Sequence, residues 1–384
     1  MRALVLGGAG AVCKETTRDL AAHSTFDEIV VADGNVPAVE SLIAETGDDR
    51  LKPLSLDADD ADAMRDLFAQ FDVVVNGLPF KYDLVVNQIC VETGVNGLDL
   101  SSDDPQFAMH DEALSKEMIF IPGVGATPGT TNVLAAKGVS RLDPDSVESI
   151  QIYFAAFRCL APAPGLLRTT IWEFNPNEPD REEAYFQDGE WVPAPPLSGE
   201  KVVRFHDQIG EQPVYWVPHD EAYSLPVSYP SLKHASVRGC FPPHVMNMMR
   251  NLKEAGALDA EPMEALGGRA PVDLVGELFL ALPWSKSNPV WAYGLVIEVE
   301  GMQNGKRTRL TYRTDHPPQD EWGGSSAYYK NVGIPLAIGA QMIADGRVTA
   351  RGVLPPEVAI PTDAYLEELE KRGMTYTEKT ETPS

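Results

Sequence analysis

The sequence has few cysteines and few basic residues, and each shortage excludes a class of protein. The four cysteines, Cys13, Cys90, Cys159 and Cys240, form no C-x-x-C pair, so neither a disulfide framework nor a zinc site is expected. The 31 lysines and arginines stand against 57 aspartates and glutamates, which gives a net charge of −26. Because a surface this acidic repels nucleic acid and anionic lipid, we expect neither as a partner.

Long apolar runs are also missing. No stretch approaches 18 apolar residues, so no membrane-spanning segment is expected. The first ten residues, MRALVLGGAG, lack the apolar core and the cleavage site of a secretory signal. We therefore expect a cytoplasmic protein, and its 384 residues suffice for two domains.

Strands and helices are predicted to alternate over the first 125 residues. Apolar runs such as EIVVA and DVVVN are continuous, which is typical of parallel strands buried on both faces. The expected strands are 3–6, 28–32, 52–57, 72–76, 96–100 and 118–121, and the expected helices are 12–22, 36–46, 60–69 and 82–93. This α/β pattern predicts a Rossmann-type doubly wound parallel sheet.

The sequence changes character after residue 122. Segments such as VESIQIYFAAF, KVVRF, PVYWV and GLVIEVEG carry alternating, β-branched or aromatic residues, and Asn304-Gly305 is a strong hairpin signal before RTRLTYRTD. Helices are expected over 242–255 and 325–345. The pattern predicts a second α/β domain with a mixed or antiparallel sheet.

A glycine-rich loop follows the first strand. Gly8 and Gly10, with Ala11 and Val12, stand where a dinucleotide fingerprint belongs, before a helix whose N-terminus would face a pyrophosphate. We expect Gly8 to permit the tight turn and Gly10 to let the backbone approach the phosphates. Cys13 replaces the third glycine, and it is small enough to preserve close packing of helix on strand.

Asp33 is the expected ribose ligand. It ends the second strand, 23 residues after Gly10, near the spacing of a carboxylate that accepts hydrogen bonds from both ribose hydroxyls. Asp33-Gly34-Asn35 contains no Arg or Lys to neutralise a 2′-phosphate. NAD is therefore favoured over NADP.

Other cofactor contacts are expected at the carboxyl edge of the same sheet. Asn76, Leu78 and Pro79 follow the fourth strand, and the backbone there should border the ribose and nicotinamide. Asp57, at the end of the third strand, is expected to accept a hydrogen bond from the adenine amino group. The alternative for Asp57 is a solvent-facing acid in the acidic stretch DADDAD.

Several segments resemble the saccharopine dehydrogenase family. They are DVVVNGLPF (72–80), PGVGATPG (122–129), GIP (333–335) and GVL (352–354), and residues 238–256 are most similar to lysine 6-dehydrogenase-type members. The resemblance implies that residues 1–125 and 330–384 form an NAD-binding domain completed by a returning C-terminal segment. It further implies that residues 126–329 form a substrate-binding and dimerisation domain, and hence a homodimer.

Catalysis requires a group that accepts an amine proton while hydride leaves the neighbouring carbon. Asp99 and Asp103, after the fifth strand, are candidates to bind a substrate ammonium or to take its proton. His244, at an expected helix start, is another acid/base candidate. The alternatives are a loop cap for Asp99 and a structural hydrogen bond for His244.

The substrate is expected to be a small zwitterion or an amine. Arg168 and Arg238 are candidates to hold its carboxylate bidentately, and Tyr82 is a further candidate contact. The alternative for both arginines is a surface or salt-bridge role. His219-Asp220-Glu221 looks metal-like, but three adjacent residues do not easily converge on one ion, so no metal is expected.

The sequence thus predicts an NAD-dependent oxidoreductase acting on a C–N bond of an amino acid or amino-acid-derived amine. Its reaction would resemble that of lysine 6-dehydrogenase or saccharopine dehydrogenase. One alternative is a redox-neutral lyase or cyclising deaminase that retains bound NAD. The other is a non-catalytic NAD-binding protein.

Overall fold

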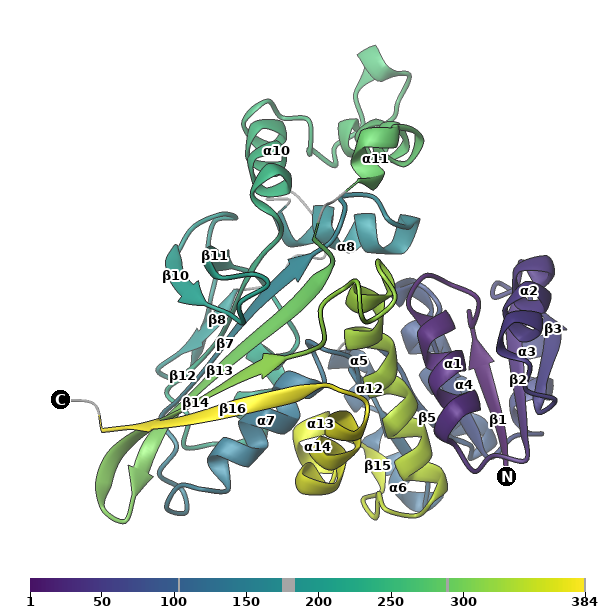
Figure 1. Ribbon diagram of the computed structural model, residues 1–384, viewed down its shortest axis with the longest axis horizontal. Helices are drawn as coiled ribbons and strands as arrows, with labels where there is room; N and C mark the ends of the chain where they lie inside the picture. Colours follow the sequence, from purple (N-terminus) through teal and green to yellow (C-terminus); the bar gives the residue numbers. More distant parts are fainter. Residues whose placement is uncertain (103, 175–183, 288–289, 383–384) are drawn as a thin grey trace. The chain divides into compact units, whose positions relative to one another are not determined.

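The protein consists of two compact units. The computed structural model describes residues 1–102, 104–174, 184–287 and 290–382. Unit 1 comprises residues 1–137 and 329–375, and unit 2 comprises residues 138–328 and the segment from 376 onward (Figure 1). These units differ from the predicted domains mainly at two places. Residues 126–137 belong to unit 1, and the chain end from residue 376 belongs to unit 2 because its strand extends the second sheet.

Unit 1 is built on a parallel seven-stranded sheet with the order β15-β6-β5-β4-β1-β2-β3. Its strands are β1 (Arg2–Leu6), β2 (Glu28–Asp33), β3 (Leu51–Ser55), β4 (Val73–Asn76), β5 (Asn96–Leu98), β6 (Ile119–Ile121) and β15 (Gly352–Val353). The chain order reverses between β1 and β4, which is where such sheets bind their ligands. The doubly wound fold is confirmed, and β15 from the returning segment completes the sheet.

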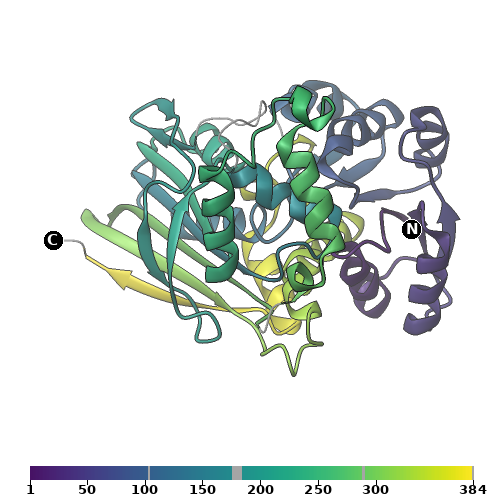
Figure 2. The same ribbon diagram turned by 90° about the horizontal axis from the view of Figure 1, so that it is seen from above.

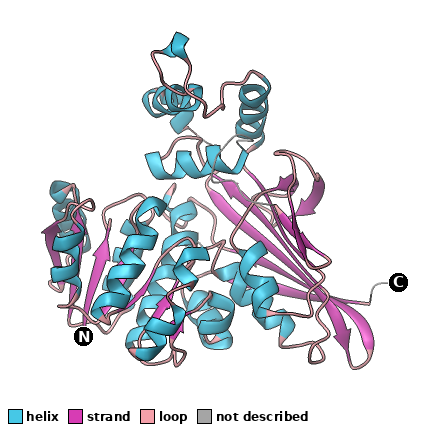
Figure 3. Cartoon of the chain, turned by 180° about the vertical axis from the view of Figure 1, so that it is seen from behind, coloured by secondary structure: helices cyan, strands magenta, loops and turns pink. Residues whose placement is uncertain are grey.

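Helices lie on both faces of this sheet (Figure 3). They are α1 (Cys13–His23), α2 (Val36–Thr46), α3 (Ala61–Phe68), α4 (Asp83–Thr93), α5 (Asp104–Phe107), α6 (His110–Ser115), α7 (Thr130–Val139), α12 (Ser326–Ala344), α13 (Pro356–Ala359) and α14 (Thr362–Lys371), with a 3-10 turn at Phe80–Tyr82. Met64 and Phe68 of α3 pack with Leu4 and Leu6 of β1 in one buried cluster. On α12, Gly333 allows close contact with α1, since a Cβ there would lie 2.8 Å from the carbonyl oxygen of Val12.

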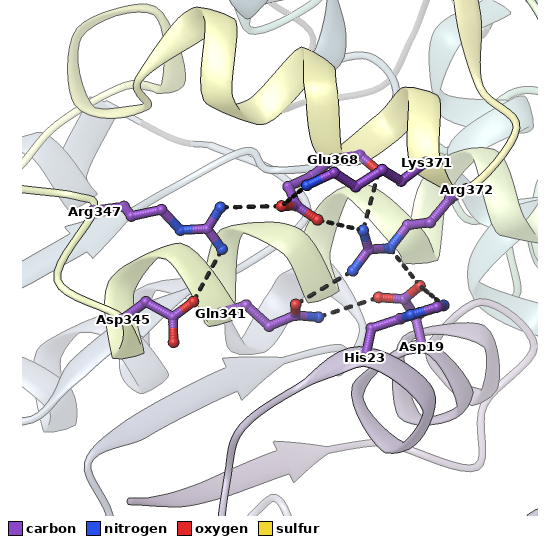
Figure 4. Close-up of polar contacts among 8 residues, drawn as sticks. All are labelled: Asp19, His23, Gln341, Asp345, Arg347, Glu368, Lys371 and Arg372. Carbon is purple, nitrogen blue, oxygen red and sulfur yellow. Dashed lines mark hydrogen bonds and ion pairs between the residues drawn. The ribbon is translucent and has the colours of Figure 1, made fainter.

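A buried polar network ties the returning segment to α1 (Figure 4). Arg372, directly after α14, donates to Asp19 of α1 at 2.7 Å, to Glu368 of α14 at 2.7 Å and to Gln341 of α12 at 3.2 Å. Gln341 also donates to Asp19 at 3.2 Å. The network thus holds α12 and α14 against the helix that follows the glycine loop.

Unit 2 is built on a larger mixed sheet with the main order β10-β11-β12-β7-β13-β14-β16. Its strands are β7 (Ser149–Phe157), β8 (Tyr185–Gln187), β9 (Glu190–Val192), β10 (Lys201–Arg204), β11 (Glu211–Trp216), β12 (His234–Cys240), β13 (Ala292–Gln303), β14 (Lys306–Asp315) and β16 (Thr375–Glu381). The central strand β7 pairs parallel with β12 and antiparallel with β13. Figure 2 shows β16 at one edge of this sheet, beside β14.

The two faces of this sheet differ in chemistry. On β7, Ile150, Ile152 and Phe154 are buried on one face, the covered face, whereas Gln151 and Tyr153 lie on the other. Tyr153 has Arg238 of β12 as its neighbour in register, so this second face is called the polar face.

Within its described residues, unit 2 has fewer helices than unit 1. They are α8 (Pro164–Phe174), α9 (Glu221–Ser228), α10 (Pro243–Glu254) and α11 (Pro271–Ala281), with 3-10 turns at Glu264–Leu266 and Pro283–Lys286. Of these, α9 packs against β12. Across the described ranges of both units, no helix has the combination of length and apolar character needed to traverse a bilayer.

Candidate functional site

The glycine loop lies at the carboxyl end of β1. Gly7, with φ of +64°, makes the tight turn, and the amide of Gly10 donates to its carbonyl at 2.9 Å. Gly8 lies at a central position of this turn. Packing also requires a glycine there, because a Cβ would lie 2.6 Å from Cγ1 of Val31. Gly10 is exposed, and a Cβ on it would meet only the carbonyl oxygen of Gly7, at 3.0 Å, so the backbone is open to a ligand.

Cys13 occupies the place of the third glycine because a different glycine compensates for its side chain. Gly77, after β4, donates its amide to the carbonyl of Leu6 at 3.0 Å. A Cβ on Gly77 would lie 1.9 Å from Sγ of Cys13. Burial raises the pKa of the Cys13 thiol to about 12, so it packs there as a neutral group. The predicted close approach of helix and strand is thus preserved.

The Asp33 carboxylate lies beside the glycine loop. Its Oδ2 accepts from the amide of Ala9 at 3.3 Å, and its Oδ1 accepts from the amide of Asn35 at 2.9 Å. Asn35 in turn caps α2 by accepting from the amide of Ala38 at 3.3 Å. These contacts hold the carboxylate at the end of β2, next to the backbone that a pyrophosphate would approach.

Asn76 shapes the loop that follows β4. Its buried side chain donates to Asp83 at 2.7 Å and accepts from the amide of Leu78 at 3.1 Å. Leu78 is half-buried and Pro79 is exposed. Asn76 thereby fixes the backbone that was predicted to border the nicotinamide side.

Two further predicted residues lie nearer the edge of unit 1. Asp57 is exposed and accepts from the amide of Asp59 at 3.0 Å. Tyr82 donates its hydroxyl to Asp59 at 2.8 Å. The adenine contact of Asp57 and the substrate contact of Tyr82 stay predictions.

Asp99 is fully buried at the end of β5. Its Oδ1 accepts from the amide of Gly123 at 2.9 Å, and its Oδ2 accepts from Nε2 of Gln106 at 2.7 Å. The carboxylate therefore orders the loop after β6 as well as α5, and its role as a proton acceptor stays a prediction. Asp103 lies outside the described residues.

A buried arginine marks the end of β7 in unit 2. Arg158 is 1% exposed, and its guanidinium donates to Tyr328 at 3.1 Å and to Thr170 of α8 at 2.6 Å. It also donates to the carbonyls of Cys159, Leu160 and Leu166. Its charge thus organises the loop between β7 and α8, close to the rings of Phe241 and Tyr328.

A histidine–glutamate pair lies on the same face of the sheet. Nδ1 of His219 and Oε2 of Glu221 are 2.5 Å apart, and the Glu221 side chain is fully buried. The His219 ring lies 5.7 Å from Phe154, whose ring is 6.4 Å from that of Tyr293. Tyr293 in turn lies 5.3 Å from Tyr328, a partner of Arg158.

The three predicted substrate and acid/base residues of unit 2 do not come together. Arg168 on α8 and His244 on α10 are exposed. Arg238 lies on the polar face, where it donates to the carbonyl of Gly199 at 2.9 Å and its guanidinium is 3.2 Å from the centre of the Trp216 ring. Arg238 is therefore on the opposite face from Arg158, and the binding roles of these residues stay predictions.

Sequence reasoning missed the polar residues on the covered face. One signal was present in YFAAFR, where Arg158 ends an otherwise apolar strand. The second was His219 two residues before Glu221. It was considered only as part of a metal site, and among the described residues no group of three or more His, Cys, Asp or Glu side chains is arranged as one.

The open glycine loop, the carboxylate at the end of β2 and the parallel sheet fit a dinucleotide, so unit 1 has the architecture of a dinucleotide-binding domain. Residues 3–121 match the saccharopine dehydrogenase NADP binding domain, and residues 125–374 match the saccharopine dehydrogenase C-terminal domain. The chain therefore belongs to the saccharopine dehydrogenase family, which confirms the predicted family.

Individual relatives agree with this membership. Carboxyaminopropylagmatine dehydrogenase of Synechocystis sp. is 27% identical over 98% of both chains. An NADP(+)-dependent, L-glutamate-forming saccharopine dehydrogenase of Pyricularia oryzae is 34% identical over 21% of this chain and 18% of its own. Apo saccharopine dehydrogenase (L-Glu forming) from Saccharomyces cerevisiae has a similar fold, with a TM-score of 0.71 and 16% identity over 99% of this chain and 100% of that chain.

Proposed function

We propose that this protein is an NAD-dependent oxidoreductase acting on a C–N bond of an amino-acid-derived secondary amine. The observation that carries the proposal is the similarity along 98% of the chain to a dehydrogenase named for carboxyaminopropylagmatine, a name that contains a carboxyl and an amino group. A substrate with both cationic and anionic groups also suits a protein of net charge −26 better than a polyanion does.

The choice of NAD rests on Asp33, although the matching domain is described as NADP-binding. Its carboxylate is held beside the loop by the amides of Ala9 and Asn35. A 2′-phosphate next to this carboxylate would be repelled, by several kcal/mol where water is excluded. We expect the dissociation constant for NADP to exceed that for NAD at least tenfold, and tighter binding of NADP would overturn the assignment.

The bound cofactor supplies a hydride acceptor at its nicotinamide ring. The residues of unit 1 would bind and orient it. Gly10 leaves the backbone accessible, Asp33 would accept hydrogen bonds from the ribose hydroxyls, and Asn76 fixes the loop at Leu78. The four buried free thiols suit a reducing compartment, which supports the cytoplasm as the place of the reaction.

We also propose a homodimer formed through the polar face of the unit 2 sheet. On this face Trp216 stacks on Tyr185 with 4.4 Å between ring centres, and the Arg238 guanidinium lies over Trp216. Lys201 and Glu298 pair nearby at 3.1 Å. Aromatic and arginine side chains that are half-buried in one chain are typical anchors of an isologous interface.

The test of the reaction is a substrate panel. Purified protein is incubated with NAD and with lysine, saccharopine or carboxyalkyl conjugates of polyamines, and the products are followed by absorbance and mass spectrometry. We expect NADH to accumulate in proportion to an imine-derived carbonyl product. Product formation without NADH would instead establish a redox-neutral lyase or cyclising deaminase, and no turnover with any amine would contradict the proposal.

A further inference from the structure

The loop that follows β4 in unit 1 is closed at its base by a buried carboxylate. Asp83, the first residue of α4, is 3% exposed. Its Oδ1 accepts from Nδ2 of Asn76, the last residue of β4, at 2.7 Å. Its Oδ2 accepts from the hydroxyl of Ser101, which follows the neighbouring strand β5. Asp83 therefore joins the two ends of the loop 77–82 to each other and to the end of β5.

This arrangement determines how the Asn76 side chain is oriented. A backbone N–H only donates, so the 3.1 Å contact with the amide of Leu78 must be made by Oδ1 of Asn76. Nδ2 then faces Asp83, and a carboxylate oxygen is the acceptor that it requires. The orientation of Asn76, and with it the position of the Leu78 backbone, therefore depends on an acceptor at position 83.

The same loop packs directly against the glycine turn. A Cβ on Gly7 would lie 2.9 Å from the carbonyl oxygen of Gly77 and 3.4 Å from the nitrogen of Leu78. The amide of Gly77 donates to the carbonyl of Leu6 at 3.0 Å, and the amide of Leu78 donates to Asn76. Because the protein occupies both amides, polar groups of a ligand can only donate to this segment. Ribose hydroxyls donate hydrogen bonds and ionised phosphate oxygens do not, so the segment suits a ribose rather than a phosphate.

The order of the strands indicates which half of a dinucleotide lies at this loop. Asp33, at the end of β2, is the expected ligand of the adenosine ribose, and the glycine loop follows β1. The sheet has the order β4-β1-β2, so β4 and β2 lie on opposite sides of β1. A dinucleotide with its adenosine half at β2 and its pyrophosphate at the glycine loop therefore extends its nicotinamide half toward β4.

We propose that Asp83 is a positioning residue for the nicotinamide half of the cofactor. By accepting from Asn76, it holds the Leu78 backbone at the place where the nicotinamide riboside binds. This inference rests on the proposed function, because it requires a bound nicotinamide dinucleotide. The adenosine half binds on the other side of β1 and does not depend on this contact. Asp83 therefore contributes to the affinity for the complete dinucleotide but not to the affinity for ADP.

The experiment compares the binding of NADH with that of ADP, which lacks the nicotinamide riboside, by isothermal titration calorimetry. Asp83→Ala should raise the dissociation constant of NADH about tenfold or more, because the buried amide of Asn76 loses its acceptor and no longer holds Leu78. The dissociation constant of ADP should stay within about twofold of wild type. Asp83→Asn keeps an oxygen acceptor toward Asn76 and gains an amide donor toward Ser101, so its NADH binding should lie within about threefold of wild type.

Asn96 offers a matched control at the opposite edge of the same sheet. It begins β5, and its Oδ1 accepts from the amide of Ile119 at 3.0 Å. Asn76→Ala and Asn96→Ala therefore each remove one side-chain acceptor of a backbone amide. Only Asn76→Ala should weaken the binding of NADH, and both variants should bind ADP as wild type does.

The outcomes separate this inference from the proposed function. If Asp83→Ala binds NADH as wild type does, or loses affinity for NADH and ADP equally, the inference is wrong and the NAD proposal stands. Asp83→Asn binding as weakly as Asp83→Ala would also overturn it, because the bond to Asn76 would then not be the cause. If Asp83→Ala does not fold, Asn76→Ala decides the question by the same comparison of NADH with ADP. If wild type binds neither NADH nor NADPH, the cofactor proposal fails and the inference fails with it.

Discussion

Replacing Arg372 by Met should destabilise unit 1 strongly. Arg372 and Asp19 are only 4% and 5% exposed, and their hydrogen bond is 2.7 Å long (Figure 4). The variant leaves the Asp19 carboxylate buried without its cation and removes a second bond to Glu368. Breaking a buried pair by removing one partner costs about 3–5 kcal/mol, which is the expected decrease in the free energy of unfolding at pH 8.

The loss should depend on pH in a defined direction. Burial raises the pKa of Asp19, and Arg372 opposes that rise, so in the variant the pKa of Asp19 in the folded state rises further. A carboxyl with a raised pKa destabilises the fold when it is ionised, and the fold regains stability as pH falls because the carboxyl is then protonated. Burial also raises the pKa of Glu368, but Lys371 and Arg372 lower it to about 2, so in wild type Glu368 stabilises the fold above pH 4.5 and that contribution is lost toward pH 2. The deficit of the variant should therefore be smaller at pH 5 than at pH 8.

The assay must report on unit 1. All six tryptophans lie in unit 2, at positions 172, 191, 216, 284, 291 and 322. Urea denaturation is therefore followed by far-UV circular dichroism as well as by tryptophan fluorescence. In the variant, the circular dichroism signal should change at a lower urea concentration than the fluorescence, because it also reports on unit 1. The control is Lys371→Ala, which removes a 65% exposed partner of Glu368 and should cost less than about 1 kcal/mol. A deficit of Arg372→Met below 1 kcal/mol at pH 8, or one equally large at pH 5, would refute the reasoning.

Two further predictions follow from close packing and from assembly. Gly77→Ala places a Cβ 1.9 Å from Sγ of Cys13, so it should lower the free energy of unfolding by about 1–3 kcal/mol and weaken NAD binding. Adding Cys13→Gly should recover most of both losses, as measured by denaturation and by binding titrations. Wild type should scatter light as twice the mass of one chain at micromolar concentration, and Arg238→Glu on the polar face should shift it to a monomer. A wild-type monomer under these conditions contradicts the dimer.

The fold of unit 1 was predictable because its signals are local. The helix expected over 36–46 begins and ends at those residues, since Asn35 caps its start and Gly47 adopts a φ of +70° at its end. The strand expected over 52–57 lies instead at Leu51–Ser55, and the strand expected over 96–100 ends at Leu98. Both errors fall at strand ends, where Leu56 and Asp99 are buried by contacts outside the strand.

The differences at the domain boundaries have another origin. The last strand, β16, is polar and mostly exposed, so its sequence carries no signal of the sheet that it joins. It pairs with β14, more than 60 residues earlier in the chain, and only the three-dimensional structure reveals that partner. In the same way, the need for a glycine at position 8 depends on Val31 of the neighbouring strand.

The two units differ in how their chemistry is encoded. In unit 1, the loop and its carboxylate follow one another within a single βαβ segment, so spacing alone located Asp33 beside Ala9. In unit 2, Arg158 meets Tyr328 across 170 positions of sequence, and His219 meets Phe154 on a strand 65 positions earlier. No spacing rule connects such residues. Arg168 and His244, which were chosen from the sequence alone, therefore lie on exposed helix surfaces. The polar side chains that the fold buries together can be recognised only in the assembled sheet.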